Sequence, residues 1–370
     1  MYTLDKKIDD IKLLKYINSY LELFKKAPEN TVFFDIETTG LSPRNSFCFL
    51  LGFIHYNENY WEESQLFCES MEDEKILFLT FNTILKQKKN LNLVHFNGNS
   101  FDIPFVKNRI KILNLNIKNE FLVDDDYESF DILKIIRTLK FLNLENYKQK
   151  TIEKFIEINR QDVLSGKELI KTYKEFIAFR ETSKRDLILL HNHEDLTGML
   201  YMLPLLNFIQ LKHPNDYIKD SIYYTTASDA LYLKVNLSYT FAKKIELRDE
   251  ITEFILSDNQ INAKIKLYNG GLKYFYENYH DYYFIPSENK VIHKSVATYI
   301  DKEFRKKATK QNCYISLNSL FVPIFSKFKD IHTFKAEYDS KLEYIEAKDF
   351  DKINKNNYLK GLISNCLNIN

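Results

Sequence analysis

Cysteine, proline and glycine are scarce in this sequence. Its 370 residues include four Cys, seven Pro and eight Gly. This composition excludes a small disulfide-stapled scaffold, a collagen-like repeat and a linker-rich chain. The cysteines lie far apart and form no C-x-x-C pair, so we expect free thiols and a reducing, cytoplasmic location.

The sequence also lacks a long hydrophobic run. No uninterrupted apolar stretch approaches the roughly 18 residues that a membrane span requires. The opening letters, MYTLDKKIDD, place acids where a signal peptide needs basic and then apolar residues. We therefore expect no membrane partner.

An excess of one charge sign is absent as well. Lys and Arg total 52 against 51 Asp and Glu, so charge alone does not indicate a nucleic-acid partner. Apolar residues, in contrast, are plentiful: 45% of the chain is hydrophobic, and it contains 29 Phe and 25 Tyr. This amount fills a packed core, and the chain length favours two domains.

Hydrophobic periodicity divides the chain into three predicted parts. Residues 1–30 hold a lead-in helix over 11–24, where apolar residues recur at helical spacing. Residues 31–212 alternate strand-like and helix-like segments, which predicts an α/β domain whose mixed sheet is flanked by helices. Residues 213–370 predict a smaller α+β accessory domain that would hold nucleic acid or a partner.

Two local signals in the last part predict particular elements. Residues 269–271, Asn-Gly-Gly, separate two strand-like halves and predict a hairpin turn. Apolar spacing over 295–311 predicts a helix. The basic residues of that helix could follow a phosphate backbone or form a solvated face.

Two carboxylates end the first buried strand of the α/β domain. Asp35 and Glu37 are two residues apart, so their side chains project to the same face of the strand. Carboxylates at a dry strand end need a charge partner, and Mg²⁺ or Mn²⁺ prefers such hard oxygen ligands. Alone, a D-x-E pair is a weak signal, because solvated surface acids are common.

Two further acids follow in distinctive segments. Asp102 lies in NGNSFDIP, on the first turn of an expected helix, and Asp195 lies in HNHEDL. The order DIETTGL, then N-G-x-x-F-D, then a helical Asp preceded by His resembles the DEDD (DnaQ-type) exonucleases of the ribonuclease H-like fold. The resemblance covers about residues 31–210. Residues 151–176 together with LLHNHEDL are most similar to the YprB-like ribonuclease H-like domain.

This resemblance implies a metal-binding role for all four acids: Asp35, Glu37, Asp102 and Asp195. Two divalent ions roughly 3.5 to 4 Å apart would activate a water and stabilise the leaving alkoxide of a phosphodiester. Asp35 would bridge the ions, while Glu37 and Asp195 complete the site of the water-activating ion. Asp102 would hold the ion at the leaving group.

His191 is the candidate general base. It lies four residues before Asp195, so the two side chains share one face of a helix, whereas His193 points elsewhere. The family carries Tyr at this spacing, or His one position earlier, where this chain has Leu190. The alternative is a surface His, or one that only orients a ligand.

Other residues near the acids are candidates for substrate contact. The resemblance implies contacts with the terminal nucleotide from Thr38, Thr39 and Leu41, the last as an apolar wedge under a base. Asn97 could hydrogen-bond its own turn or the substrate, and Phe101 could stack on a base or belong to the core. We interpret Asp131 as structural, and we do not count Asp162, in the R-x-D segment, among the metal ligands.

The sequence therefore predicts a metal-dependent 3′ to 5′ exonuclease that acts on single-stranded nucleic-acid ends. Polarity and end preference come from the resemblance. Two alternatives stay open: a weakly active or inactive nucleic-acid-binding protein on the same fold, and a structure-selective endonuclease. DNA and RNA are not distinguished by the residues, because that choice depends on accommodation of the 2′-hydroxyl, and protein partners stay unknown.

Overall fold

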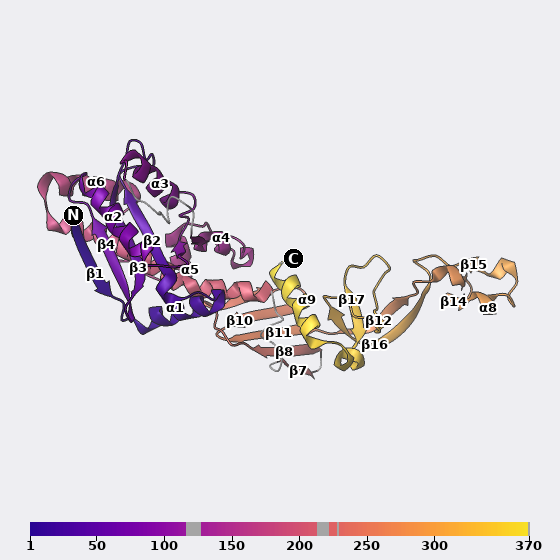
Figure 1. Ribbon diagram of the computed structural model, residues 1–370. Coiled ribbons are helices and arrows are strands. Elements are labelled where there is room, and N and C mark those ends of the chain that lie inside the picture. The colour runs from indigo at the N-terminus through magenta and orange to yellow at the C-terminus, as the bar shows by residue number, and fades with distance from the viewer. Residues whose placement is uncertain (116–126, 213–221, 228, 369–370) are drawn as a thin grey trace. The chain divides into compact units, whose positions relative to one another are not determined.

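The computed structural model describes residues 1–115, 127–212, 222–227 and 229–368. The chain divides into two compact units, Met1–Ile209 and Gln210–Asn370. Figure 1 draws both units and labels their elements where there is room. In the described residues no helix is long and apolar enough to cross a membrane.

A six-stranded mixed sheet forms the centre of the first unit. Its strands lie in the order β1-β4-β3-β2-β5-β6. Their bounds are β1 Tyr2–Lys7, β2 Thr31–Thr38, β3 Cys48–Asn57, β4 Tyr60–Phe67, β5 Asn92–His95 and β6 Glu128–Asp131. Strands β2, β5 and β6 run parallel, so their carboxyl ends meet at one edge of the sheet. The first thirty residues contribute β1 to this sheet.

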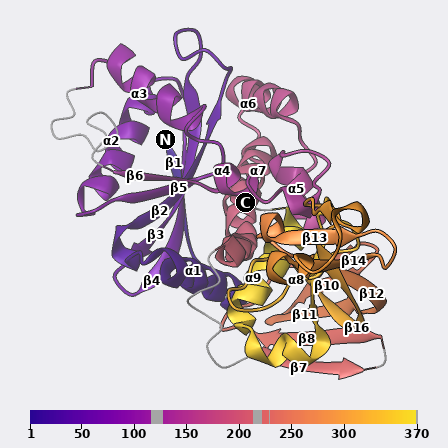
Figure 2. The same cartoon turned by 90° about the vertical axis from the view of Figure 1, so that its right-hand side faces the viewer.

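Seven α-helices accompany the sheet in the described part of this unit. They are α1 Ile11–Phe24, α2 Asp73–Lys86, α3 Asp102–Ile112, α4 Ile132–Ile136, α5 Gln149–Phe155, α6 Gly166–Phe179 and α7 Thr182–Met202. Figure 2 shows α2 and α3 on one side of the sheet and α5 and α7 on the other. The predicted mixed sheet flanked by helices is confirmed.

Strand β2 is buried on both faces, as its apolar sequence predicts. Phe34 and Ile36 pack into a core cluster with Phe78 and Phe81 of α2. Because side chains alternate along a strand, the intervening acids face the opposite side, which α7 covers.

Two glycines let helices approach closely on that side. Gly52 of β3 lies opposite Asp35 in the ladder, and a Cβ there would lie 1.9 Å from Asn192 Oδ1 of α7. Gly198 of α7 likewise allows the close approach of α5, since a Cβ at this position would lie 2.0 Å from Glu153 Oε1. Both glycines therefore fix the position of α7.

In the second unit, the described residues form three sheets. Their strand orders are β7-β8-β11-β10-β9, β12-β16-β17 and β14-β13-β15. The bounds are β7 Ile222–Ala227, β8 Ala230–Asn236, β9 Ile245–Arg248, β10 Thr252–Ser257, β11 Gln260–Lys266, β12 Tyr268–Phe275, β13 Tyr282–Ile285, β14 Lys290–His293, β15 Lys306–Lys307, β16 Tyr314–Ile324 and β17 Glu343–Glu346, with helices α8 Lys294–Ala297 and α9 Lys355–Leu367. The expectation of a second domain with strands and helices is confirmed.

Both local predictions in this unit are wrong. The Asn-Gly-Gly segment, residues 269–271, continues inside β12 and pairs with residues 318–320 of β16. The segment 295–311 forms only the end of α8, a 3₁₀ turn at Lys302–Phe304 and β15. Its apolar side chains Val296, Tyr299 and Phe304 are exposed, so no buried face stabilises a long helix.

Gly52→Ala should lower the free energy of unfolding by roughly 1 to 3 kcal/mol, because the added methyl group overlaps Asn192. Chemical denaturation measures the change. Gly166→Ala is the matched control, since nothing lies within 4 Å of a Cβ there. Equal stability of the two variants would contradict the close approach of α7 to β3.

Candidate functional site

The four acids from distant segments line one open pocket of about 680 Å³. Asp35 and Glu37 project from the end of β2, Asp102 from the first turn of α3, and Asp195 from α7. His191, one turn before Asp195, lines the same pocket.

The turn after β5 places Asp102 against the end of β2. Asn97 adopts a left-handed backbone conformation, with φ of 65°, and its backbone N–H donates to Asp131 Oδ1 at 3.0 Å. The backbone N–H of Gly98 donates to His95 Nδ1 at 2.9 Å. Asp131 thus holds the turn that starts α3, which agrees with its structural interpretation.

Burial and mutual repulsion disfavour the charged forms of the clustered acids. Burial raises the pKa of Asp35 and of Glu37 well above the usual range, and the charges of Asp195 and Asp102 raise both further. Burial also raises the pKa of Asp102 from 3.8 to about 7, although backbone hydrogen bonds oppose the shift.

No lysine or arginine among the described residues forms an ion pair with Asp35, Glu37 or Asp102. Closely spaced oxygen ligands without a basic partner suit a hard divalent cation. In addition, ligand atoms of Glu37, His191 and Asp195 all lie within 4.8 Å of one another. The residues present therefore fit a divalent metal.

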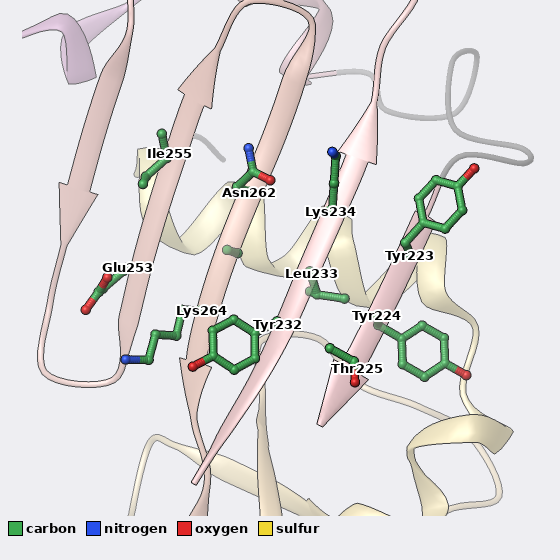
Figure 3. Close-up of a pocket in the computed structure, with 11 residues that line it drawn as sticks. Tyr223, Tyr224, Thr225, Tyr232, Leu233, Lys234, Glu253, Ile255, Asn262 and Lys264 are labelled. Carbon is green, nitrogen blue, oxygen red and sulfur yellow. The ribbon is translucent and has the colours of Figure 1, made fainter. Parts of the chain in front are cut away.

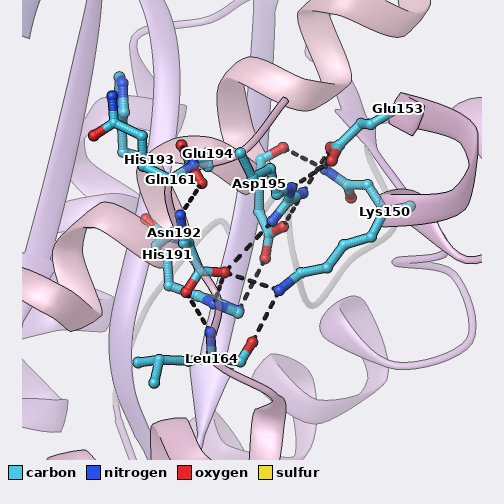
Figure 4. Close-up of polar contacts among 12 residues, drawn as sticks. Lys150, Glu153, Gln161, Leu164, His191, Asn192, His193, Glu194 and Asp195 are labelled. Atoms are coloured by element: carbon cyan, nitrogen blue, oxygen red, sulfur yellow. Dashed lines mark hydrogen bonds and ion pairs between the residues drawn. The ribbon is translucent and has the colours of Figure 1, made fainter. Parts of the chain in front are cut away.

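Asp195 differs from the other acids because it has a basic partner. Arg160 Nη2 lies 2.5 Å from Asp195 Oδ1 and 2.6 Å from Glu153 Oε1. Both acids are labelled in Figure 4. Burial lowers the pKa of Arg160, but the hydrogen bonds and charges of Glu153 and Asp195 outweigh it and raise the pKa. One oxygen of Asp195 is thus engaged by Arg160, and the other faces the pocket.

The His191 ring lies between Asp162, which is outside the pocket, and two acids that line it, Glu37 and Asp195. Its Nδ1 lies 2.8 Å from Asp162 Oδ2, whereas Nε2 lies 3.5 Å from Glu37 Oε1 and 3.4 Å from Asp195 Oδ2. Since a carboxylate only accepts, we assign the proton to Nδ1, which leaves the Nε2 lone pair directed into the pocket.

Asp162 is buried but charged. Burial raises its pKa, yet the hydrogen bonds from Lys150 Nζ, at 2.8 Å, and from the backbone N–H of Leu164 outweigh burial and lower it. On the sequence alone we do not count this acid among the metal ligands, and its contact with His191 is not identified. The signal in the sequence is the R-x-D pattern at residues 160–162. It places Arg160, the partner of Asp195, and Asp162, the partner of His191, on one loop.

Asn192 was also missed. Its Nδ2 donates to Asp35 Oδ2 at 3.0 Å, and its Oδ1 accepts from Gln65 Nε2 at 3.0 Å. His193, one residue later, turns away from the pocket, and its Nδ1 lies 2.7 Å from Glu63 Oε2.

The predicted substrate contacts fall into two groups. Asn97 and Phe101 line the pocket. Thr38, Thr39 and Leu41 are not among the lining residues. Thr38 Oγ1 donates to the Gly40 carbonyl, Thr39 Oγ1 accepts from the Phe47 backbone N–H, and Leu41 is 85% exposed.

Residues that the sequence did not indicate complete the pocket wall. They are Leu133, Arg137, Tyr147, Lys148 and Gln149, with Ile36 and Phe96 between the acids. Gln149 Nε2 donates to the Asp195 carbonyl at 2.8 Å. Arg137 and Lys148 bring positive charge to the pocket that the acids line, which suits a phosphate-bearing ligand.

Comparison with known proteins bears on the first unit. Residues 32–207 match the family model RNase_H_2, described as the RNase_H superfamily. A search of curated proteins finds no match.

Solved structures with similar folds include nucleases and a polymerase. Zinc-bound E. coli ExoI in a complex with single-stranded DNA is 13% identical, with a TM-score of 0.34, and the match covers 55% of this chain and 53% of that one. ExoI from Methylocaldum szegediense is 13% identical, with a TM-score of 0.30 and coverage of 61% and 53%. The family B DNA polymerase of Pyrobaculum calidifontis is 12% identical, with a TM-score of 0.37 and coverage of 67% and 34%.

This chain spans about half the length of those ExoI proteins and about a third of the polymerase. Because the TM-scores are low, no residue role is transferred from these structures. The family match and the mixed sheet flanked by helices agree, and residues 32–207 therefore have a ribonuclease H-like fold.

Proposed function

We propose that this protein is a metal-dependent nuclease that removes nucleotides from the 3′ ends of single-stranded nucleic acid. The convergence of Asp35, Glu37, Asp102 and Asp195 on one pocket carries the proposal. The 3′ to 5′ direction and the preference for single-stranded ends rest on the resemblance to DEDD exonucleases. We propose that residues 31–212 form the nuclease domain and residues 213–370 the accessory domain. All four cysteines are free, which supports a cytoplasmic location.

Two divalent ions, Mg²⁺ or Mn²⁺, would be held by Asp35, Glu37, Asp102 and the pocket-facing oxygen of Asp195. When bound, they supply a nucleophilic water near neutral pH and neutralise charge on the scissile phosphate. Asn192 orients the Asp35 carboxylate through its hydrogen bond.

His191 is proposed as the group that accepts a proton from the attacking water. Its Nε2 faces the pocket, and Asp162 at Nδ1 fixes the required tautomer and stabilises the imidazolium that forms. Asp162 does not reach the pocket, so it is a positioning residue. A neutral His can accept a proton near pH 7, which the family's Tyr does less readily.

Substrate contacts follow from exposure and pocket position. Leu41 projects into solvent beyond the end of β2, where it is free to wedge under a base. Phe101 and Asn97 line the pocket beside the acids, and Thr38 and Thr39 maintain the turn that presents Leu41.

One observation favours a second candidate, a nucleic-acid-binding protein with slow or no catalysis. Arg160 engages one oxygen of Asp195 at 2.5 Å, so this acid has less capacity to hold a cation. Nucleic-acid binding without Mg²⁺-dependent cleavage would select this candidate. Cleavage of single-stranded circles would instead select an endonuclease.

Asp35→Asn should reduce Mg²⁺-dependent digestion of end-labelled single-stranded DNA and RNA by at least about 10³-fold, because an ion in such a site contributes several kcal/mol to transition-state stabilisation. EDTA should abolish wild-type digestion. Asp186→Asn, an exposed acid of α7, is the control and should retain activity. Full activity of Asp35→Asn would rule out the metal site.

Asp162→Asn should lower kcat by about 10- to 100-fold with little change in KM, since the amide no longer holds the His191 tautomer. Single-turnover digestion separates the two constants. Glu194→Gln tests the loop alone, because the Glu194 carboxylate accepts from the backbone N–H groups of Gln161 and Asp162, whereas Asp162 itself is the acid hydrogen-bonded to His191 Nδ1. Equal losses in both variants would mean that Asp162 acts only through loop structure.

In EDTA, the free energy of unfolding should fall as pH rises from about 4 to about 7. The unfolded chain releases the Asp102 proton near its ordinary value of 3.8, whereas the folded chain holds it until about 7. The folded state binds more protons in this window, so its stability is lost as pH rises.

A bound cation removes that repulsion, so Mg²⁺ should raise Tm more at pH about 7.5 than at pH about 5. Thermal melts with and without Mg²⁺ measure the difference. Asp102→Asn should show a shallower decline of stability with pH. An Mg²⁺ effect that is the same at both pH values would contradict the assignment of the acids to a cation.

A further inference from the structure

The five-stranded sheet of the second unit has one covered face and one open face. Along β8, Leu231, Leu233 and Val235 are buried, whereas Tyr232 is 40% exposed and Lys234 is exposed. The adjacent strands β10 and β11 show the same alternation. The covered face is core, and the open face needs another explanation.

The strand register places aromatic and basic side chains together on this open face. Tyr223 lies opposite Lys234, Thr225 lies opposite Tyr232, and Tyr232 lies opposite Lys264. Figure 3 shows these side chains spread over three neighbouring strands, around a shallow hollow of about 380 Å³. Tyr223 and Tyr232 are diagonal neighbours in the register, which places their Cα atoms roughly 7 to 8 Å apart.

Charge on this face remains available to a ligand. Neither Lys234 nor Lys264 forms an ion pair with another described residue. Glu253, the acid that lies opposite Lys264, lowers the positive potential at one end of the face. Asn262, opposite Lys234, adds a neutral amide that can both donate and accept hydrogen bonds.

We propose that this face binds a single-stranded segment of nucleic acid. Bases stack on the Tyr223 and Tyr232 rings, and Lys234 and Lys264 contact the phosphates between them. Exposed aromatic rings interleaved with lysines on a sheet are suited to this ligand, because every base has a stacking face and every linkage carries a negative charge. The inference rests on the proposed function, since a nuclease that trims single strands needs a surface to retain them.

The composition of the face disfavours a protein partner. Lysine is depleted in the cores of protein interfaces, where it would lose its hydration, and here two lysines flank the exposed rings. A polyanion compensates those charges. The other basic and aromatic surface of this unit, around Tyr299 and Lys302, serves as a comparison in the test.

The test measures binding without cleavage. Full-length protein carrying Asp35→Asn, in EDTA, is titrated into fluorescein-labelled oligo-dT and oligo-U of about 12 nucleotides, and anisotropy gives Kd. Tyr223→Ala and Tyr232→Ala should each weaken binding about tenfold, the middle of the range for loss of one stacking platform. Lys234→Gln with Lys264→Gln should reduce the slope of log Kd against log salt by about 1.4, or about 0.7 for each lost phosphate contact.

Matched controls change the same residue types elsewhere in this unit. Tyr299→Ala removes a tyrosine that is 90% exposed, and Lys348→Gln removes a lysine whose side chain is 71% exposed. Both controls should bind as the parent does. Glu253→Gln should tighten binding and leave stacking unchanged.

Three outcomes would overturn the proposal: no oligonucleotide binding by the parent, unchanged Kd in the face variants, or loss of binding only in the Tyr299 variant. If a face variant changes the sedimentation coefficient of the protein and leaves the Kd for the oligonucleotide unchanged, the face is a protein interface instead. Binding through this face without Mg²⁺-dependent cleavage by the wild type would defeat the proposed function and leave this inference standing. If the wild type cleaves in the presence of Mg²⁺ and the face variants bind the oligonucleotides normally, the proposed function stands and this inference fails.

Discussion

The accumulation of carboxylates at the carboxyl end of β2 is the constraint on which the site depends. Asp35, Glu37 and Asp102 gather where burial and mutual repulsion raise their pKa values, and no lysine or arginine of the described residues forms an ion pair with them, although the charge of Arg160 partly offsets the shift at Glu37. Such an arrangement costs stability unless a cation binds. A fold that maintains it is poised to take up positive charge, and the divalent ions of the proposed reaction are the simplest form of that charge.

Helix α7 is the element that turns this cluster into a site. It carries His191, Asn192 and Asp195 on consecutive turns, and it approaches β3 because Gly52 leaves room for Asn192. The loop before α6 then supplies a partner to each end of the arrangement, Arg160 to Asp195 and Asp162 to His191. Arg160 and Asp162 therefore orient Asp195 and His191, for which we propose roles in metal binding and catalysis, whereas Asp35, Glu37 and Asp102 form no ion pair with a lysine or arginine of the described residues.

The second unit shows a different use of strand alternation. In β2 both faces are covered, so its acids reach only the pocket at the strand end. In the sheet of β7, β8, β11, β10 and β9 one face is open, and tyrosines and lysines stand in adjacent register positions. A pocket for chemistry and an open sheet for holding a strand would complement each other in one chain.

The sequence by itself determined the α/β class of the first unit and the buried strand that carries Asp35 and Glu37, because buried strands are local patterns. Its resemblance to a known family singled out the four acids that line one pocket. It did not reveal Arg160, the contact of Asp162 with His191, or Asn192 against Asp35, since each depends on segments that meet only after folding. It also misread residues 269–271 and 295–311, where pairing with β16 and the absence of a buried face override turn and helix signals. Tertiary structure decided these points because hydrogen-bond partners and burial are set by long-range contacts, which a one-dimensional pattern does not contain.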